Sequence, residues 1–472
     1  MNIKKASLIN AIGKFSTIFL NLAVTAVLAR ILTPNDYGVV AVITVFSTFF
    51  STFSDMGFGA AIIQKKELSV QDVNNIFSFT GYIAAILAFL FLLLSYPISL
   101  FYNNDAYLTL GAMLSVSLFF NALNMVPNGM MNRDKKFVLI AVRTVVVYLS
   151  AALITIALAF AGLRYYALAI QAILTALFNF LWNYLQTRPR FRLRFQMDSI
   201  KKVINYSGFQ FAFNIVNYFS RNLDNLLTGK FIGSAALGYY NKAYNLMLYP
   251  VNNLAGIVSP VLHPILSDYQ NQPQTIYNKY MRLVKFLANL GIFVAPVCYL
   301  AGSEAITILY GSNWLDSVAC FQLLSFAIIP QMINSSVGAV FQAINQTKLL
   351  FLSSCINTLI TVAAILVGIF AGGNIVTLSA YIALAYNIHF LTSIIVLICS
   401  GFHFNFFAFV RNLLPQLCML VIMIIGVVLY PFTIHGVVFS GLVKGLWLSV
   451  FYLAALFVTK EHRTLLSIIK RK

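Results

Sequence analysis

The basic residues of this chain fall almost entirely in alternate gaps between long apolar segments. We predict about fourteen such segments, each long enough to cross the roughly 30 Å hydrocarbon core of a bilayer as a helix. They span residues 10–32, 38–63, 77–100, 107–131, 139–161, 163–185, 205–229, 234–262, 283–302, 316–343, 349–371, 374–400, 407–430 and 434–458.

The alternation of charge also predicts the topology. One set of gaps and ends holds most of the Lys and Arg residues, from Lys4 through the segment Arg188 to Arg194 to Lys472, whereas the other set holds only Arg30, Arg164, Lys230 and Lys444. Because cationic loops resist translocation, the rich side is expected to be cytoplasmic. Both termini then lie inside, which requires an even number of helices.

Composition supports a multi-pass membrane protein. The chain is 60% hydrophobic and 9% charged, which excludes an ordinary soluble domain. A net charge of +19 would suggest a nucleic-acid partner in a soluble protein, but here it belongs mostly to the cytoplasmic loops. We therefore expect it to attract anionic membrane lipids, with no nucleic-acid partner. The five cysteines are scattered, and no spacing indicates a metal site.

An internal repeat predicts the domain organisation. A shift of 200 positions places Ser7 on Ser207, Arg30 on Lys230 and Gly38 on Gly238. Both copies run from the cytoplasm to the outside, so we expect two six-helix lobes related by a pseudo-twofold axis along the membrane normal. The predicted boundaries are an N-terminal lobe at 1–186, a basic cytoplasmic linker at 187–204, a C-terminal lobe at 205–400, and helices 13 and 14 with a basic tail at 401–472.

The first and seventh helices carry a matching polar stripe. Its members recur at steps of three and four residues, which is one face of a helix: Asn10, Lys14, Thr17 and Asn21 align with Gln210, Asn214, Asn217 and Arg221, and the second stripe continues to Asp224 and Thr228. Polar groups in a bilayer cost free energy unless they meet water or a partner. The stripes therefore either line a water-filled cavity between the lobes or form a buried seam, in which Lys14 snorkels and Arg221 pairs with Asp224.

The cavity interpretation predicts an anionic substrate. Lys14, Arg221 and Lys242 outnumber the nearby carboxylates, and guanidinium and ammonium groups suit phosphate oxygens. Asn and Gln side chains can satisfy sugar hydroxyls. The candidate substrate-binding residues are Lys14, Asn21, Asn214, Asn217, Arg221, Asp224 and Lys242.

Three short segments carry a family resemblance. The run Leu32-Thr-Pro-Asn-Asp-Tyr-Gly38, the segment Ser54-Asp-Met-Gly-Phe-Gly59 and the element Ala236-Leu-Gly-Tyr-Tyr-Asn241 resemble the lipopolysaccharide and teichuronic acid exporters of the Wzx type. Those exporters are lipid-linked oligosaccharide flippases, in one superfamily with the MATE drug antiporters and the lipid II flippases. The resemblance covers the whole chain.

The resemblance implies a substrate and a mechanism. A protein of this type would carry an undecaprenyl diphosphate-linked oligosaccharide from the inner to the outer leaflet of the bacterial plasma membrane by alternating access. Basic residues on the first, second, seventh and eighth helices would engage the diphosphate, which applies to Lys14, Arg221 and Lys242. No cofactor is expected. Some relatives use an ion gradient, so Asp55 and Asp224 are candidate coupling groups for H⁺ or Na⁺. Polysaccharide polymerase or ligase machinery would be the protein partner.

Two other functions compete with the flippase. A multidrug antiporter would share the fold, but its lumen should favour carboxylates for cationic drugs, whereas basic residues predominate here. An enzyme such as a polysaccharide polymerase needs paired carboxylates or an external catalytic domain. The chain shows neither pattern, so we expect no catalytic activity.

Overall fold

In a computed structural model of the chain, the described residues are 3–55, 58–65, 67–201, 208–255, 262, 266, 268–270 and 272–462. Side chains within 3–15, 54–55, 60, 208–217 and 219–220 lie outside this description. Throughout the described ranges, all regular elements are helices, which confirms the all-α membrane fold. The chain forms two compact units, Met1–Gly238 and Tyr239–Lys472.

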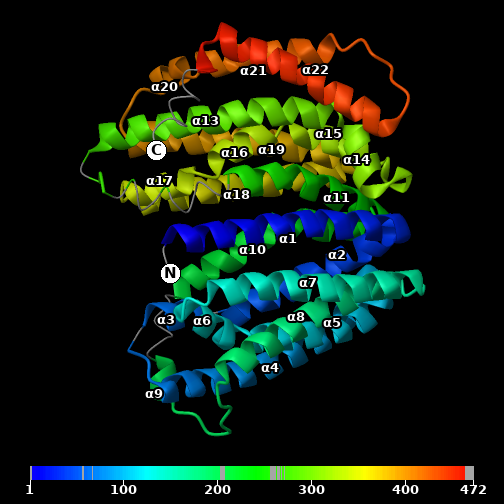
Figure 1. Cartoon of the computed structure of the whole chain (residues 1–472), viewed down its shortest axis with the longest axis vertical. Coiled ribbons are helices and arrows are strands. Elements are labelled where there is room, and N and C mark those ends of the chain that lie inside the picture. The colour runs from blue at the N-terminus through cyan, green and yellow to red at the C-terminus, as the bar shows by residue number, and fades with distance from the viewer. Residues whose placement is uncertain are drawn as a thin grey trace. The chain divides into compact units, whose positions relative to one another are not determined.

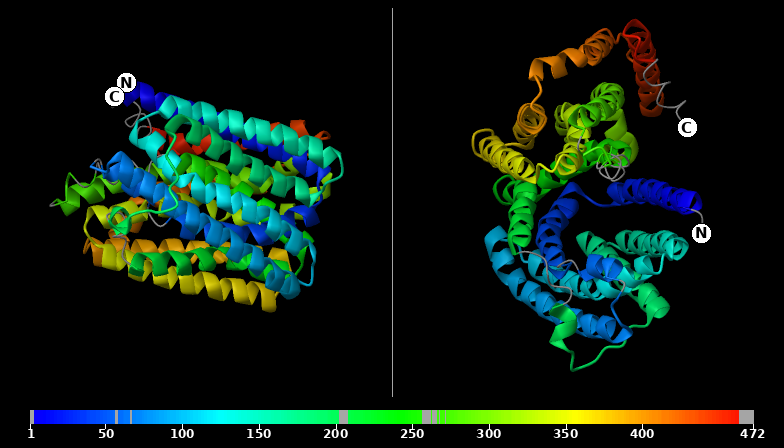
Figure 2. Two further views of the ribbon diagram at one scale, coloured as in Figure 1. Left: turned by 90° about the horizontal axis from the view of Figure 1, so that it is seen from below. Right: turned by 90° about the vertical axis from the view of Figure 1, so that its left-hand side faces the viewer.

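The first unit contains long helices joined by short loops (Figure 1). Its elements are α1 (Ile3–Ile31), α2 (Pro34–Asp55), α3 (Phe58–Gln64), α4 (Val70–Tyr102), α5 (Ala106–Leu123), α6 (Met125–Arg133), α7 (Phe137–Phe160), α8 (Tyr165–Thr187), α9 (Met197–Lys201) and α10 (Gly208–Phe231). Within this unit α4 packs along α5, and α1 packs along α7. The right-hand view of Figure 2 looks along several of these helices.

The second unit contains the remaining helices, of which α11 begins just before the boundary. Its elements are α11 (Ser234–Pro250), η1 (Val251–Ala255), α13 (Pro273–Leu300), α14 (Gly302–Tyr310), η2 (Ser312–Trp314), α15 (Ser317–Ser325), α16 (Ile328–Asn334), α17 (Val337–Ala343), α18 (Thr347–Phe370), α19 (Ile375–Ile395), η3 (Val396–Gly401), α20 (Phe406–Asn412), α21 (Leu414–Val428) and α22 (Val437–Val458). Within it, α21 packs against both α22 and α13 (Figure 1).

The helices account for all of the predicted membrane spans. Among the described residues, nine helices are long and apolar enough to cross a membrane, or eleven if each bent pair forms one span. The three predicted spans outside this set are α1, α10 and α11. In α1 the part whose side chains are described, Ser16–Ile31, is shorter than a membrane span. Helices α10 and α11 carry many polar residues, which on α10 include the predicted stripe. About fourteen transmembrane helices are therefore present.

The internal repeat is visible in the helix register of the two units. Helices α7 and α18 both have 24 residues, and they begin at Phe137 and Thr347, 210 positions apart. Helices α8 and α19 begin at Tyr165 and Ile375, again 210 positions apart. The residue two positions before each of α7 and α18 also matches, because Lys135 and Asn345 both adopt a left-handed backbone. The fifth and sixth spans are thus repeated as the eleventh and twelfth.

The boundary between the compact units differs from the predicted lobe boundary. Helix α10 packs against α2 and α4 and so belongs to the first unit, whereas the repeat assigns it to the second lobe. Packing and internal repetition are separate criteria, so the lobe boundaries at 186 and 205 stay a prediction.

The basic linker is bound to the first turns of α4. The backbone amides of Arg190 and Arg192 donate to Asn74 Oδ1 and Ser78 Oγ, each at 2.8 Å. Tyr82 donates its hydroxyl to the Leu193 carbonyl at 2.8 Å. Because alternate amides face α4, the side chains of the four linker arginines remain exposed. Hydrogen bonds to α4 consequently hold the backbone at 190–193 while the charges of the four arginines stay available to solvent or lipid headgroups.

An ion pair links α22 to α14 within the second unit. Lys444 Nζ on α22 lies 2.5 Å from Glu304 Oε1 on α14, and Ser440 donates to the same oxygen at 2.7 Å. Ser303 donates to Oε2 at 2.9 Å. Burial raises the pKa of the Glu304 carboxyl, but the hydrogen bonds from Lys444 and the serines outweigh it, so the pKa lies below its usual range.

Replacing Glu304 with Gln should destabilise the second unit by about 3 kcal/mol, because Lys444 would keep its charge in a largely buried place without a counterion. Thermal unfolding of the purified protein in detergent measures the loss. The double variant Glu304→Gln, Lys444→Met is the control and should recover most of the stability. The stabilisation of the native protein should also be present at neutral pH and decline as the pH falls through the lowered pKa of Glu304. Equal unfolding temperatures for the single variant and the native protein would contradict the assignment.

Candidate functional site

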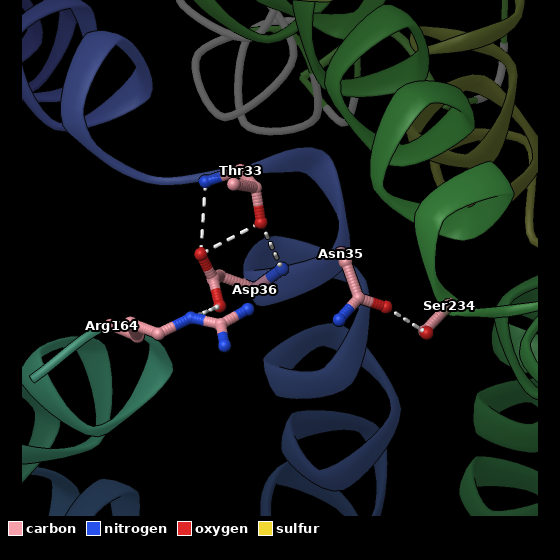
Figure 3. A network of polar contacts seen from close by, with 5 residues as sticks. All are labelled: Thr33, Asn35, Asp36, Arg164 and Ser234. Carbon is pink, nitrogen blue, oxygen red and sulfur yellow. Dashed lines mark hydrogen bonds and ion pairs between the residues drawn. The ribbon is translucent and has the colours of Figure 1, made fainter.

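The first family segment forms the start of α2. Thr33 donates to Asp36 Oδ2 from its amide at 2.9 Å and from its hydroxyl at 2.8 Å, and the Asp36 amide donates back to Thr33 Oγ1 at 3.3 Å. Pro34 occupies the first position of the helix, where its missing N–H costs nothing. The order Thr-Pro-Asn-Asp therefore caps α2, as Figure 3 shows.

A basic residue from another loop completes this cap. Arg164 Nε, at the beginning of α8, lies 3.1 Å from Asp36 Oδ1, and the carboxylate itself is almost fully buried (Figure 3). Arg164 was one of the few basic residues predicted on the outer side. Its ion pair with Asp36 links the loop between α7 and α8 to the first turn of α2.

Two family segments pack against each other through their glycines. Ser234 donates its hydroxyl to Asn35 Oδ1, which joins the first turns of α11 and α2 (Figure 3). A Cβ atom on Gly38 would lie 1.6 Å from the Ser234 carbonyl oxygen, and one on Gly238 would lie 1.9 Å from that of Pro34. Only glycine allows the two backbones to approach so closely. The repeat-related residues Gly38 and Gly238 thus hold these helix ends together.

Two predicted substrate-binding residues lie exposed on membrane-spanning helices. Asn21 on α1 and Arg221 on α10 occupy equivalent positions in the repeat, and both side chains are exposed. Arg221 lies about 20 Å along α10 from its first residue. It makes no ion pair with the described part of the chain, including Asp224. An exposed guanidinium at this depth is stable only where water or an anion reaches it.

Asp224 and Lys242 are buried. The Asp224 carboxylate accepts a hydrogen bond from the Asn225 amide at 2.8 Å, and only 3% of the residue is exposed. Lys242, on α11, places its ammonium 5.4 Å from the ring centre of Tyr310 and 5.8 Å from that of Trp314. Cation–π contacts of this kind stabilise a desolvated ammonium. In this conformation Lys242 contacts aromatic rings of its own unit.

Four predicted residues cannot be placed in the site. The side chains of Lys14, Asn214, Asn217 and Asp55 lie outside the described part of the structure, although α1, α10 and α2 contain their backbones. Their roles stay predictions.

An open cavity of about 440 Å³, lined by both polar and apolar groups, lies in the first unit beside α1. Its polar lining consists of Asn21, Thr25, Tyr37, Ser117, Asn121, Tyr148, Gln171 and Thr175. These described lining residues include no charged side chain, so the cavity offers neutral hydrogen-bonding groups, which suit hydroxyls or water. Asn21 already accepts a hydrogen bond from Thr25 at 3.2 Å.

Sequence reasoning named Asn21 but missed its neighbours in this cavity and the aromatic rings around Lys242. Gln171 and Thr175 lie one helical turn apart on α8, which is a detectable signal. Nothing in the sequence pattern connects Lys242 with Tyr310 or Trp314, because contact between α11 and the α14 region is tertiary.

Comparison with known proteins identifies the family. The model of the family described as "Polysaccharide biosynthesis protein" matches residues 27–319, which include the capped start of α2 and both packed glycines. The chain belongs to this family.

Named relatives agree with that assignment. The lipopolysaccharide biosynthesis protein WzxC of Escherichia coli is 25% identical over 76% of this chain and 73% of its own length. The teichuronic acid biosynthesis protein TuaB of Bacillus subtilis is 26% identical over 65% of this chain and 64% of its own length. Both names match the resemblance found in the short segments.

A solved structure shows the same fold. The lipid II flippase MurJ in an inward closed conformation superposes with a TM-score of 0.74 over 97% of this chain and 100% of its own, at 16% identity. This family member is therefore a multi-pass protein with the MurJ fold. The chain is thus a member of a polysaccharide biosynthesis family, and its fold is that of a multi-pass membrane protein.

Replacing Gly238 with Ala should destabilise the protein by about 1–3 kcal/mol, because the new Cβ would overlap the Pro34 carbonyl and separate α2 from α11. Thermal unfolding in detergent measures the effect. Gly445→Ala on α22 is the matched control: a Cβ there meets nothing within 4 Å, so Ala should be neutral or slightly stabilising. Equal responses of the two variants would show that the close approach of α2 and α11 is unimportant.

Proposed function

We propose that this protein moves an undecaprenyl diphosphate-linked oligosaccharide from the cytoplasmic to the outer leaflet of the plasma membrane by alternating access. The transported glycan would serve export of a cell-surface polysaccharide. The observation that carries the proposal is the exposed guanidinium of Arg221 on a membrane-spanning helix of a polysaccharide biosynthesis family member.

The charges of the candidate site support an anionic cargo. Arg221 has no carboxylate partner in the described part of the chain, and the described lining of the cavity beside α1 consists of neutral hydrogen-bonding and apolar residues. A diphosphate would bring two or more negative oxygens to the guanidinium, and hydroxyls of the glycan could bind amides such as Asn21. A drug antiporter for cations would need carboxylates in the same place, so this alternative is less favoured.

The finer features of the proposal follow from the sequence. Both termini would lie in the cytoplasm, and Lys14, Asn214 and Asn217 would line the substrate path together with Arg221. Asp55 and Asp224 are the proposed coupling groups for H⁺ or Na⁺. Lys242 would leave its aromatic contacts to reach the diphosphate in another conformation. The protein would act by transport and not by catalysis, and it would supply polysaccharide polymerase or ligase machinery.

Replacing Arg221 with Ala should slow transport at least about tenfold, because a charge-assisted contact to phosphate contributes roughly 1.5–3 kcal/mol. The measurement is transfer of a fluorescent undecaprenyl diphosphate-sugar across liposomes that contain the purified protein. Arg188→Ala in the exposed linker is the control and should keep the native rate, since it removes an equal charge far from the stripe in sequence. Transfer at the native rate by the Arg221→Ala variant would contradict the proposed path. If the native protein and the variant both transferred none of a panel of glycans, the proposed function would be contradicted.

A further inference from the structure

A second polar cavity in the first unit has a lining that the proposed function does not use. Its volume is about 400 Å³, and its polar lining comes from Ser51 on α2 and from Asn121, Asn124 and Asn128 on and between α5 and α6. Gly59 on α3 forms another part of the wall. Asn121 also lines the first cavity, so the two spaces adjoin. The described lining residues carry no charge.

A buried arginine lies behind this lining. Arg143 on α7 is only 8% exposed, and it donates from its Nη1 atom to Asn128 Oδ1 at 3.0 Å and to Asn183 Oδ1 at 2.7 Å. It forms no ion pair with any described residue, and its Nε has no hydrogen-bond partner there. A buried guanidinium without a carboxylate leaves a positive charge uncompensated next to the cavity.

The arginine determines how the asparagine amides are oriented. Because a guanidinium has donors and no acceptor, it must bind the oxygen of Asn128 and of Asn183. Asn183 then donates from Nδ2 to Asn124 Oδ1 at 2.8 Å. The side-chain oxygens of both Asn124 and Asn128 are therefore occupied by donors. Their Nδ2 groups donate to no described residue, which leaves them available to the cavity.

The repeat shows that helix packing alone does not require this charge. Positions 143 and 183 correspond to Ser353 and Ser393, given the shift of 210 between the paired helices. These two serines also contact each other, with 3.3 Å between their Oγ atoms, and both are buried. At these two positions the same helix pair in the second unit has neutral hydroxyls, and Asn357 Nδ2 also donates to Ser393 Oγ at 2.9 Å. Arg143 introduces a positive charge that is specific to the first unit.

We infer that this cavity is an oxyanion-binding site, in which the Nδ2 groups of Asn124 and Asn128 bind phosphate or carboxylate oxygens and Arg143 supplies the balancing charge. The oxyanion could belong to a diphosphate or to an acidic sugar. None of its residues is among the predicted substrate-binding residues, and the inference does not rest on the transport activity, because its test is equilibrium binding.

The decisive variant is Asn128→Asp. It keeps an oxygen for Arg143, removes the Nδ2 donor, and adds a negative charge that pairs with the guanidinium, so folding should be preserved and oxyanions repelled. Asn179→Asp on α8 is the matched control, because it makes the same change of charge at a residue outside the cavity lining, where the amide donates to the Thr175 carbonyl. Thermal unfolding verifies that both variants are folded.

Isothermal titration of the full chain in lipid nanodiscs at constant ionic strength would use inorganic pyrophosphate, glucuronate and glucose as probes. We expect pyrophosphate or glucuronate to bind the native protein, glucose not to bind, and Asn128→Asp to weaken oxyanion binding at least about tenfold. The probe that binds identifies the source as diphosphate or acidic sugar. The inference is overturned if neither oxyanion binds the native protein, if Asn128→Asp leaves the affinity unchanged, or if Asn179→Asp lowers it equally.

Discussion

A polar group inside a bilayer must contact water or another polar group, and this requirement explains most of the structure. The spans that face lipid meet it with helices whose backbone groups bind internally and whose side chains are apolar. The polar residues that remain are concentrated on a few helices. Some are paired inside a unit, as Glu304 is with Lys444, and others are exposed on α1 and α10. The second group is the one that requires a water-filled path.

Close contact between the first turn of α2 and the residues Ser234 and Gly238, which lie at the start of α11 and belong to the first unit, is a strict packing constraint. It depends on two glycines that the internal repeat places at equivalent positions, and on a capping box that determines where α2 begins. Arg164 adds an ion pair to the same cap. Since these residues belong to the segments that carry the family resemblance, the resemblance reflects a structural contact. It does not by itself identify the substrate path.

The two halves of the chain use the same helices for different chemistry. In the first unit Arg143 orients a set of asparagines around a cavity, whereas the equivalent pair in the second unit is two serines. In the second unit Lys242 is buried against aromatic rings, and Glu304 is neutralised by a lysine. An internal repeat therefore conserves helix length and register while each unit acquires its own arrangement of charge. Such asymmetry allows one half to bind a ligand that the other half does not.

Hydrophobic periodicity, the distribution of Lys and Arg, and the repeat were sufficient to predict an all-helical membrane protein with about fourteen spans, because each of these signals is local or depends only on the bilayer. Spacing also places Asn21 and Arg221 on polar helix faces, since one helical face is readable from the sequence. It leaves open which members of the stripe are buried, and the structure buries Asp224 while Arg221 is exposed. The burial of Lys242 by Tyr310 and Trp314 could not be predicted, nor could the orientation of Asn124 and Asn128 by Arg143. Those arrangements are contacts between helices distant in the sequence, and only tertiary packing decides which polar groups meet each other and which are left for a ligand.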